Sequence, residues 1–95
     1  MKIGIIGIGL IGGSLAIELK KTFKGVKVFG HDSSQTNLKL SLDTDLIDGI
    51  IYKKDYKDLD VIFVTVPVKE ISKQLPEILD LVSSKTLVVD FGSTK

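Results

Sequence analysis

The amino-terminal stretch "KIGIIGIGLIGGSLAIEL", residues 2–19, combines an almost unbroken apolar run with five glycines. Glycine destabilises the interior of helices and strands, so this density needs a physical reason. A secretory signal peptide is one explanation, but Lys2 is the only basic residue before the run, and the glycines would weaken a helical apolar region. The other explanation is a strand that turns sharply into a helix around a phosphate. We therefore predict a strand, a tight turn and a helix.

Three of the glycines have the spacing G-x-G-x-x-G between a predicted strand, 3–6, and a predicted helix from residue 11 to about residue 21. In this context Gly7 permits the tight turn, Gly9 lets the backbone approach a pyrophosphate, and Gly12 allows the helix to lie close to the strand. The amides and the dipole at the helix start favour the phosphate charge. Glycines that only let helix and sheet pack are the alternative. The cofactor-binding residues predicted from this segment are Gly7, Ile8, Gly9, Leu10, Ile11 and Gly12.

Asp32 lies twenty residues after Gly12, just beyond a predicted second strand at 26–30. A dinucleotide-binding fold places an acidic residue there, where it accepts hydrogen bonds from the adenosine ribose. Capping the following helix is the alternative role. The carboxylate would repel a 2′-phosphate and the next two residues are serines, which supply no cation, so the sequence favours NAD over NADP. His31 is the only histidine, and we expect it at the surface or at the ribose edge.

The rest of the chain alternates strand and helix patterns. Further strands are predicted at 49–52, which is weak and suits a sheet edge, at 60–67 and at 86–90. Dense apolar strands of this kind are typical of a parallel sheet covered on both faces. The order of elements predicts a single α/β domain over residues 1–95. We expect a Rossmann-type, doubly wound parallel sheet with helices on both faces.

The remaining helices have recognisable start and stop signals. One is predicted to begin at Ser33 or Ser34 and to end near residues 43–45. A second is predicted from Val68, and Pro76 is expected to break it and to start a new segment. The residues expected to point inward from the helices are Ile11, Leu15, Leu19, Leu38, Leu42, Ile78, Leu79 and Val82.

Composition limits the classes of function. A net charge of +1 and a hydrophobic fraction of 43% argue against disorder and against a nucleic-acid partner. No segment outside the amino-terminal stretch reaches the roughly 18 apolar residues of a membrane span, so we expect a soluble, cytoplasmic protein without a membrane partner. The chain has no cysteine, hence no disulfide and no thiolate metal site, and we expect no bound metal. All 13 basic residues are lysines, so arginine, the usual clamp for carboxylates, is absent.

The reacting end of a bound cofactor is expected where the fourth and fifth predicted strands end. In open parallel sheets the ligand lies across the carboxyl ends of the strands, where the strand order reverses. Val66 and Pro67 are therefore predicted to bind the cofactor, although Pro67 has the simpler role of ending a strand and starting a helix. Asp90 is expected to orient its loop. Ser93 is the candidate to touch substrate, with an ordinary turn residue as the alternative.

Four segments together resemble the amino-terminal domain of prephenate and arogenate dehydrogenases. They are "GIGLIGGSLA" at 7–16, "GHD" at 30–32, "VTVPV" at 64–68 and "VVDFGSTK" at 88–95. The resemblance implies NAD-dependent oxidative decarboxylation of prephenate to 4-hydroxyphenylpyruvate, a step toward tyrosine. It implies that the glycines and Asp32 hold NAD, that Ser93 helps to position a catalytic histidine, and that Lys95 has a supporting role.

The chain departs from that family in what it lacks. The family's catalytic histidine, its substrate-binding arginine and the helical domain that pairs its subunits are not found in these 95 residues. We therefore expect the cofactor half of a homodimeric enzyme for a small-molecule substrate, with negligible turnover by itself. Two alternatives remain open. One is the cofactor domain of an arogenate, β-hydroxyacid or pyrroline-carboxylate type of oxidoreductase, and the other is a non-catalytic NAD(H)-sensing module.

Overall fold

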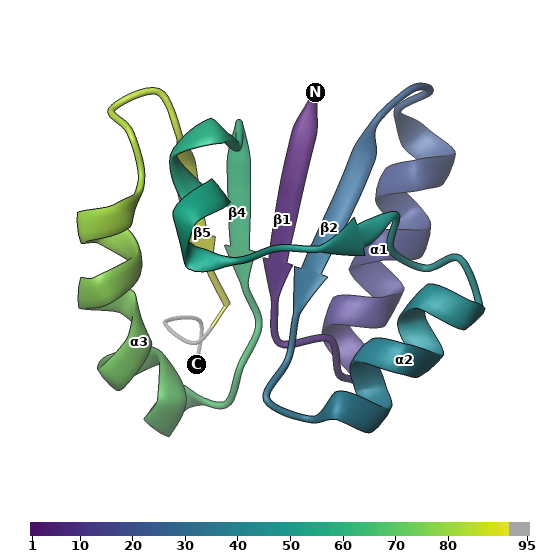
Figure 1. Ribbon diagram of the computed structural model, residues 1–95, viewed down its shortest axis with the longest axis horizontal. Coiled ribbons are helices and arrows are strands. Elements are labelled where there is room, and N and C mark those ends of the chain that lie inside the picture. Colours follow the sequence, from purple (N-terminus) through teal and green to yellow (C-terminus); the bar gives the residue numbers. More distant parts are fainter. Residues whose placement is uncertain (92–95) are drawn as a thin grey trace.

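A five-stranded, all-parallel sheet forms the centre of the computed structural model, which describes residues 1–91 (Figure 1). The spatial order of the strands is β3-β2-β1-β4-β5. Their bounds are β1 (Lys2–Ile6), β2 (Lys27–His31), β3 (Gly49–Ile50), β4 (Val61–Val64) and β5 (Leu87–Asp90). The weak strand near residue 49 is two residues long and lies at the sheet edge, as predicted.

Helices cover both faces of this sheet. Helices α1 (Leu10–Thr22) and α2 (Gln35–Asp43) lie on one side, and α3 (Val68–Leu81) lies on the other (Figure 1). A 3-10 helix, η1 (Lys53–Asp58), which the sequence analysis did not predict, packs against α3. The predicted Rossmann-type, doubly wound fold is confirmed. Within residues 1–91, every helix is too short or too polar to cross a lipid bilayer.

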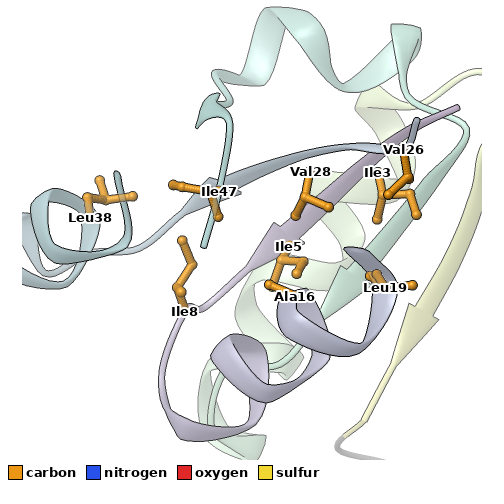
Figure 2. Packing of buried hydrophobic residues seen from close by; sticks show 9 residues of the cluster. All are labelled: Ile3, Ile5, Ile8, Ala16, Leu19, Val26, Val28, Leu38 and Ile47. Atoms are coloured by element: carbon orange, nitrogen blue, oxygen red, sulfur yellow. The ribbon is translucent and has the colours of Figure 1, made fainter. Parts of the chain in front are cut away.

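The first strand is buried on both faces because its side chains alternate between two cores. Ile3 and Ile5 point toward α1, where they meet Ala16 and Leu19 (Figure 2). Ile6 belongs to the second core, beneath α3 and η1. All three isoleucines are at most 2% exposed. Complete burial of each of these side chains stabilises the fold by roughly 1.5–3 kcal/mol. Strand β1 is therefore a rigid base for the loop that follows it.

The order of connections creates a switch point beside β1. The chain moves outward from β1 through β2 to β3, and then returns to place β4 on the other side of β1. The connections after β1 and β4 therefore leave the sheet on opposite faces, through α1 and α3 (Figure 1). In such folds a crevice opens between these two carboxyl ends.

Helix α3 corrects one prediction. Pro76 does not break it, and the helix is continuous from Val68 to Leu81. Proline removes the amide that would bond the carbonyl four residues earlier, that of Ser72. Both residues are exposed, so water can satisfy that carbonyl. Since the helix is unbroken, Ile78 is buried at 2% exposure, as predicted, whereas Leu79 is 53% exposed and the prediction that it points inward is wrong.

Candidate functional site

A cleft of about 720 Å³ lies at the carboxyl ends of the strands, at the switch point. Segments that follow four strands of the sheet meet there, and α1, α2 and α3 supply the remaining walls. The residues lining it are Ile6, Gly7, Gly9, Ile11, His31, Asp32, Ser33, Asn37, Thr65, Val66, Pro67, Val68, Glu70, Gln74 and Phe91. Ile11, predicted to face the core, is instead 58% exposed and lines this cleft, because the first turn of α1 extends beyond the end of β1.

Gly7 makes the turn that ends β1. Its φ of +94° lies in the region that side chains disfavour. A β-carbon at this position would lie 2.6 Å from Cγ1 of Val66 and 2.9 Å from the Val66 amide nitrogen. The tight turn predicted at Gly7 is therefore confirmed, for both conformational and steric reasons.

Gly12 brings α1 close to the strand. A β-carbon there would overlap the Gly7 carbonyl oxygen and lie 3.0 Å from the Thr65 hydroxyl and 3.2 Å from Cγ2 of Ile5. Gly9 differs from both other glycines of the motif, because no described atom apart from its own chain neighbours lies within 4 Å of its β-carbon position. Close packing therefore explains why glycine is needed at positions 7 and 12. It does not explain Gly9, whose backbone lines the open cleft.

The amino-terminal end of α1 is suited to an anion. Gly9 is the N-cap and provides no side-chain hydrogen bond, and residues 10–13 include no acidic group. Leu10 is the first helical residue, and the first helical bond of the turn runs from the Gly13 amide to the Gly9 carbonyl at 2.8 Å. The amides before it point out of the helix end, where backbone N–H groups and the helix dipole favour phosphate.

Asp32 connects the glycine loop to α2. Its Oδ2 accepts a hydrogen bond from the Ile8 amide at 2.8 Å, and its Oδ1 accepts one from the Ser34 amide at 2.8 Å. Ser34 is the N-cap of α2, since its hydroxyl accepts a hydrogen bond from the Asn37 amide at 3.2 Å. The capping role considered for Asp32 thus belongs chiefly to Ser34. Each carboxylate oxygen can accept a second hydrogen bond, so Asp32 can still receive ribose hydroxyls from the cleft that it lines.

A family model described as "Prephenate dehydrogenase, nucleotide-binding domain" matches residues 15–95. The chain belongs to this family. It is 32% identical to the prephenate dehydrogenase of Bacillus subtilis (strain 168), covering 96% of this chain and 25% of that relative. It is 31% identical to the prephenate dehydrogenase of Lactococcus lactis subsp. cremoris (strain MG1363), covering 99% of this chain and 27% of that relative. The chain thus spans about a quarter of the length of these curated relatives.

Solved structures agree with this assignment. Synechocystis arogenate dehydrogenase superposes with a TM-score of 0.87 at 29% identity, over 100% of this chain and 34% of that one. The prephenate dehydrogenase of Aquifex aeolicus, crystallised with hydroxyphenyl propionate and NAD+, superposes with a TM-score of 0.87 at 26% identity and the same coverage. Both the family model and the solved structures thus describe this chain as a nucleotide-binding domain of the prephenate dehydrogenase family.

Val66 and Pro67, predicted to bind the cofactor, line the cleft on the wall formed by the end of β4. Pro67 is also the N-cap of α3, and its carbonyl accepts the Glu70 amide at 2.8 Å, so its strand-ending role holds as well. Ile8 does not line the cleft. Its side chain is buried in the first core, and its amide anchors Asp32. Ser93 and Lys95 lie outside the described residues.

Sequence reasoning gave no site role to Asn37, Glu70 or Gln74, which line the cleft, whereas it expected Phe91 at the nicotinamide end. It also gave no separate role to Thr65, whose hydroxyl donates hydrogen bonds to the carbonyls of Gly7 and Ile6. A signal for Thr65 was available, because it is the one polar side chain within the apolar stretch 61–68.

Proposed function

We propose that this domain binds NAD+ and NADH across the switch point, with the pyrophosphate over Gly9 and the adenosine ribose on Asp32. The observation that carries the proposal is the open backbone of Gly9 at the start of α1, beside a carboxylate held by the same loop. The complex of the Aquifex aeolicus relative with NAD+ supports it. When bound, the nicotinamide supplies a hydride acceptor at the end of the cleft near Val66 and Pro67.

Asp32 would also set the preference for NAD over NADP. A carboxylate repels a 2′-phosphate, and among the described residues that line the cleft there is no lysine or arginine to compensate. Titration of the purified chain with NADH and NADPH at equal ionic strength tests this. The chain contains no tryptophan, so nicotinamide fluorescence reports binding directly. We expect NADH to bind at least about tenfold more tightly, a difference of about 1.4 kcal/mol. Equal or tighter binding of NADPH would refute the proposal.

We further propose that the whole protein oxidises prephenate. Hydride passes from the ring carbon that bears the hydroxyl to NAD+, carbon dioxide leaves that ring, and the products are 4-hydroxyphenylpyruvate, carbon dioxide and NADH. The names of both curated relatives above 30% identity support prephenate, and the Synechocystis structure supports arogenate as the second candidate. In this proposal Ser93 acts at the substrate end, and the 95 residues alone have negligible turnover.

An activity assay on the intact parent protein separates these candidates. NADH formation would be followed with prephenate, arogenate and β-hydroxyacids in turn, and we expect the highest kcat/KM with prephenate. Ser93→Ala in the parent should lower kcat if the domain serves an enzyme. NAD binding without any of these oxidations, and without an effect of Ser93→Ala, would instead indicate an NAD(H)-sensing module. A cytoplasmic location and a homodimeric parent are also part of the proposal, to be checked by fractionation and sedimentation.

A further inference from the structure

One peptide group of the glycine loop is held at both ends by side chains from different strands. The carbonyl of the Gly7–Ile8 peptide accepts a hydrogen bond from the Thr65 hydroxyl. The amide of the same peptide donates to Oδ2 of Asp32 at 2.8 Å. Thr65 follows β4 and Asp32 follows β2, the two strands that flank β1 in the sheet (Figure 1). The neighbouring strands on both sides of β1 therefore fix the orientation of this single peptide.

The Gly7 carbonyl needs a donor from outside α1. The helical ladder of α1 begins with the Gly9 carbonyl, so the Gly7 carbonyl lies before its first acceptor. Gly7 is buried, and its carbonyl oxygen lies between the α-carbon of Gly12 and the Thr65 hydroxyl that follows β4. A buried carbonyl without a donor is costly, and the Thr65 hydroxyl meets that need.

Asp32 depends on the same peptide. If the Gly7–Ile8 peptide rotated, the Ile8 amide would turn away from Oδ2 and leave the carboxylate anchored only by the Ser34 amide at Oδ1. The carboxylate would then be free to rotate out of the position from which it reaches a ribose. The phosphate-facing backbone at Gly9, two residues after Gly7, would shift with the loop.

We infer that Thr65 is a positioning residue of the nucleotide site, whose hydroxyl fixes the Gly7–Ile8 peptide and through it the carboxylate of Asp32. This inference rests on the proposed binding of a dinucleotide in the cleft. Thr65 lies on the β4 side of the switch point, yet by this inference it affects ribose recognition by Asp32 at the end of β2. The predicted result is a loss of selectivity as well as a loss of affinity.

The test compares Thr65→Val, which keeps the shape and removes the hydroxyl, with Thr65→Ser, which keeps the hydroxyl and removes the methyl group. The Kd values of the full chain for NADH and NADPH and the melting temperature are measured for each. We expect Thr65→Val to weaken NADH binding about tenfold and to lower the preference for NADH over NADPH, whereas Thr65→Ser stays within about twofold of the wild type. A general loss of structure would weaken both dinucleotides equally and leave the preference unchanged, which would overturn the inference.

A double-mutant cycle with Asp32→Asn tests the coupling itself. If the hydroxyl acts through Asp32, Thr65→Val should cost less than about threefold in NADH affinity in the Asp32→Asn background. Full additivity would overturn the inference. Should Thr65→Val not fold, Thr65→Ala compared with Thr65→Ser isolates the same hydroxyl on a smaller side chain. A wild-type chain that binds neither dinucleotide refutes the proposed function, whereas selective wild-type binding that Thr65→Val leaves unchanged refutes only the role of Thr65.

Discussion

The α-carbon of Gly12 faces the carbonyl oxygen of Gly7 so closely that a β-carbon on Gly12 would overlap that oxygen. The obstacle is backbone and cannot move aside as a flexible side chain would. Gly12→Ala gains helix propensity of at most about 1 kcal/mol. We expect the overlap to outweigh this gain and to lower the free energy of unfolding by about 1–3 kcal/mol, with a parallel loss of NADH affinity, measured by urea denaturation and titration.

The neighbouring glycine is the matched control. Gly13 lies in the same helix, and its β-carbon position is 3.8 Å from Cδ1 of Leu46, an ordinary contact. Gly13→Ala should therefore keep its propensity gain and raise the free energy of unfolding by up to about 1 kcal/mol. If the two substitutions have equal effects on stability, the close approach of Gly12 to the Gly7 carbonyl is not what selects glycine there.

The glycine motif was predictable because local backbone geometry sets its roles. Gly7 makes the tight turn and Gly12 lets α1 lie close to the strand, as their spacing between a strand and a helix predicts. Thr65 was not predictable in the same way, because its contact with Gly7 depends on the register of β4 against β1, where Ile6 pairs with Val64. Ile11 was misassigned because helical periodicity does not reveal where a helix extends past the sheet.

The error in α3 has a single physical origin. Restarting the helix at Pro76 shifts the expected inward face to residues 78, 79 and 82. In the continuous helix the inward face follows Ile71, Leu75 and Ile78 at spacings of four and three and continues to Val82, so of the three predicted residues only Leu79 falls outside it. The rule that proline ends a helix failed because the affected carbonyl is on the exposed side.

Asp32→Asn should change nucleotide selectivity more than stability. The amide oxygen can still accept one of the two backbone hydrogen bonds, from Ile8 or Ser34, but the negative charge that opposes a 2′-phosphate is removed. We expect the NADH preference over NADPH to fall at least about tenfold and the free energy of unfolding to fall by about 1 kcal/mol. Paired titrations and urea unfolding measure both. Retention of the full preference for NADH would show that Asp32 does not face the ribose.

Asp48 should make stability depend on acidic pH. Partial burial raises the pKa of Asp48, but the hydrogen bonds from the Val28 amide at 2.8 Å and from Lys20, together with the charges of Lys20 and Lys27, outweigh it and hold the pKa below 3.8. A depressed carboxyl pKa contributes stability above the unfolded value of 3.8, which is lost as the pH falls through the folded value.

Asp48→Asn should accordingly lower the free energy of unfolding at neutral pH by about 1 kcal/mol. The amide oxygen of asparagine can still accept the Val28 hydrogen bond but without the charge that strengthens it, and the exposed ion pair with Lys20 adds little. The difference from wild type should shrink when urea unfolding is repeated below pH 3.8. Asp43→Asn, at the exposed end of α2, changes the net charge equally and serves as the control. A difference that stays constant with pH would mean that the charged form of Asp48 is not favoured by folding.

Pro76→Ala should stabilise the domain. Alanine restores the amide that the Ser72 carbonyl lacks and is preferred over proline in a helix interior by up to about 3 kcal/mol. Part of this gain is offset because proline also restricts the unfolded chain, by up to about 1 kcal/mol. We expect a net rise of about 1–2 kcal/mol in the free energy of unfolding, measured by urea denaturation.

Ser72→Ala is the control for Pro76→Ala, since it lies on the same exposed side of α3 and should change stability by less than about 0.5 kcal/mol. Ile71 and Ile78 are the buried residues of α3, so neither substitution changes a buried side chain. A loss of stability in Pro76→Ala would mean that the ring contributes packing in the shallow apolar groove that it shares with Leu75 and Leu79. In that case the proline would be retained for its contacts rather than tolerated in spite of its missing amide.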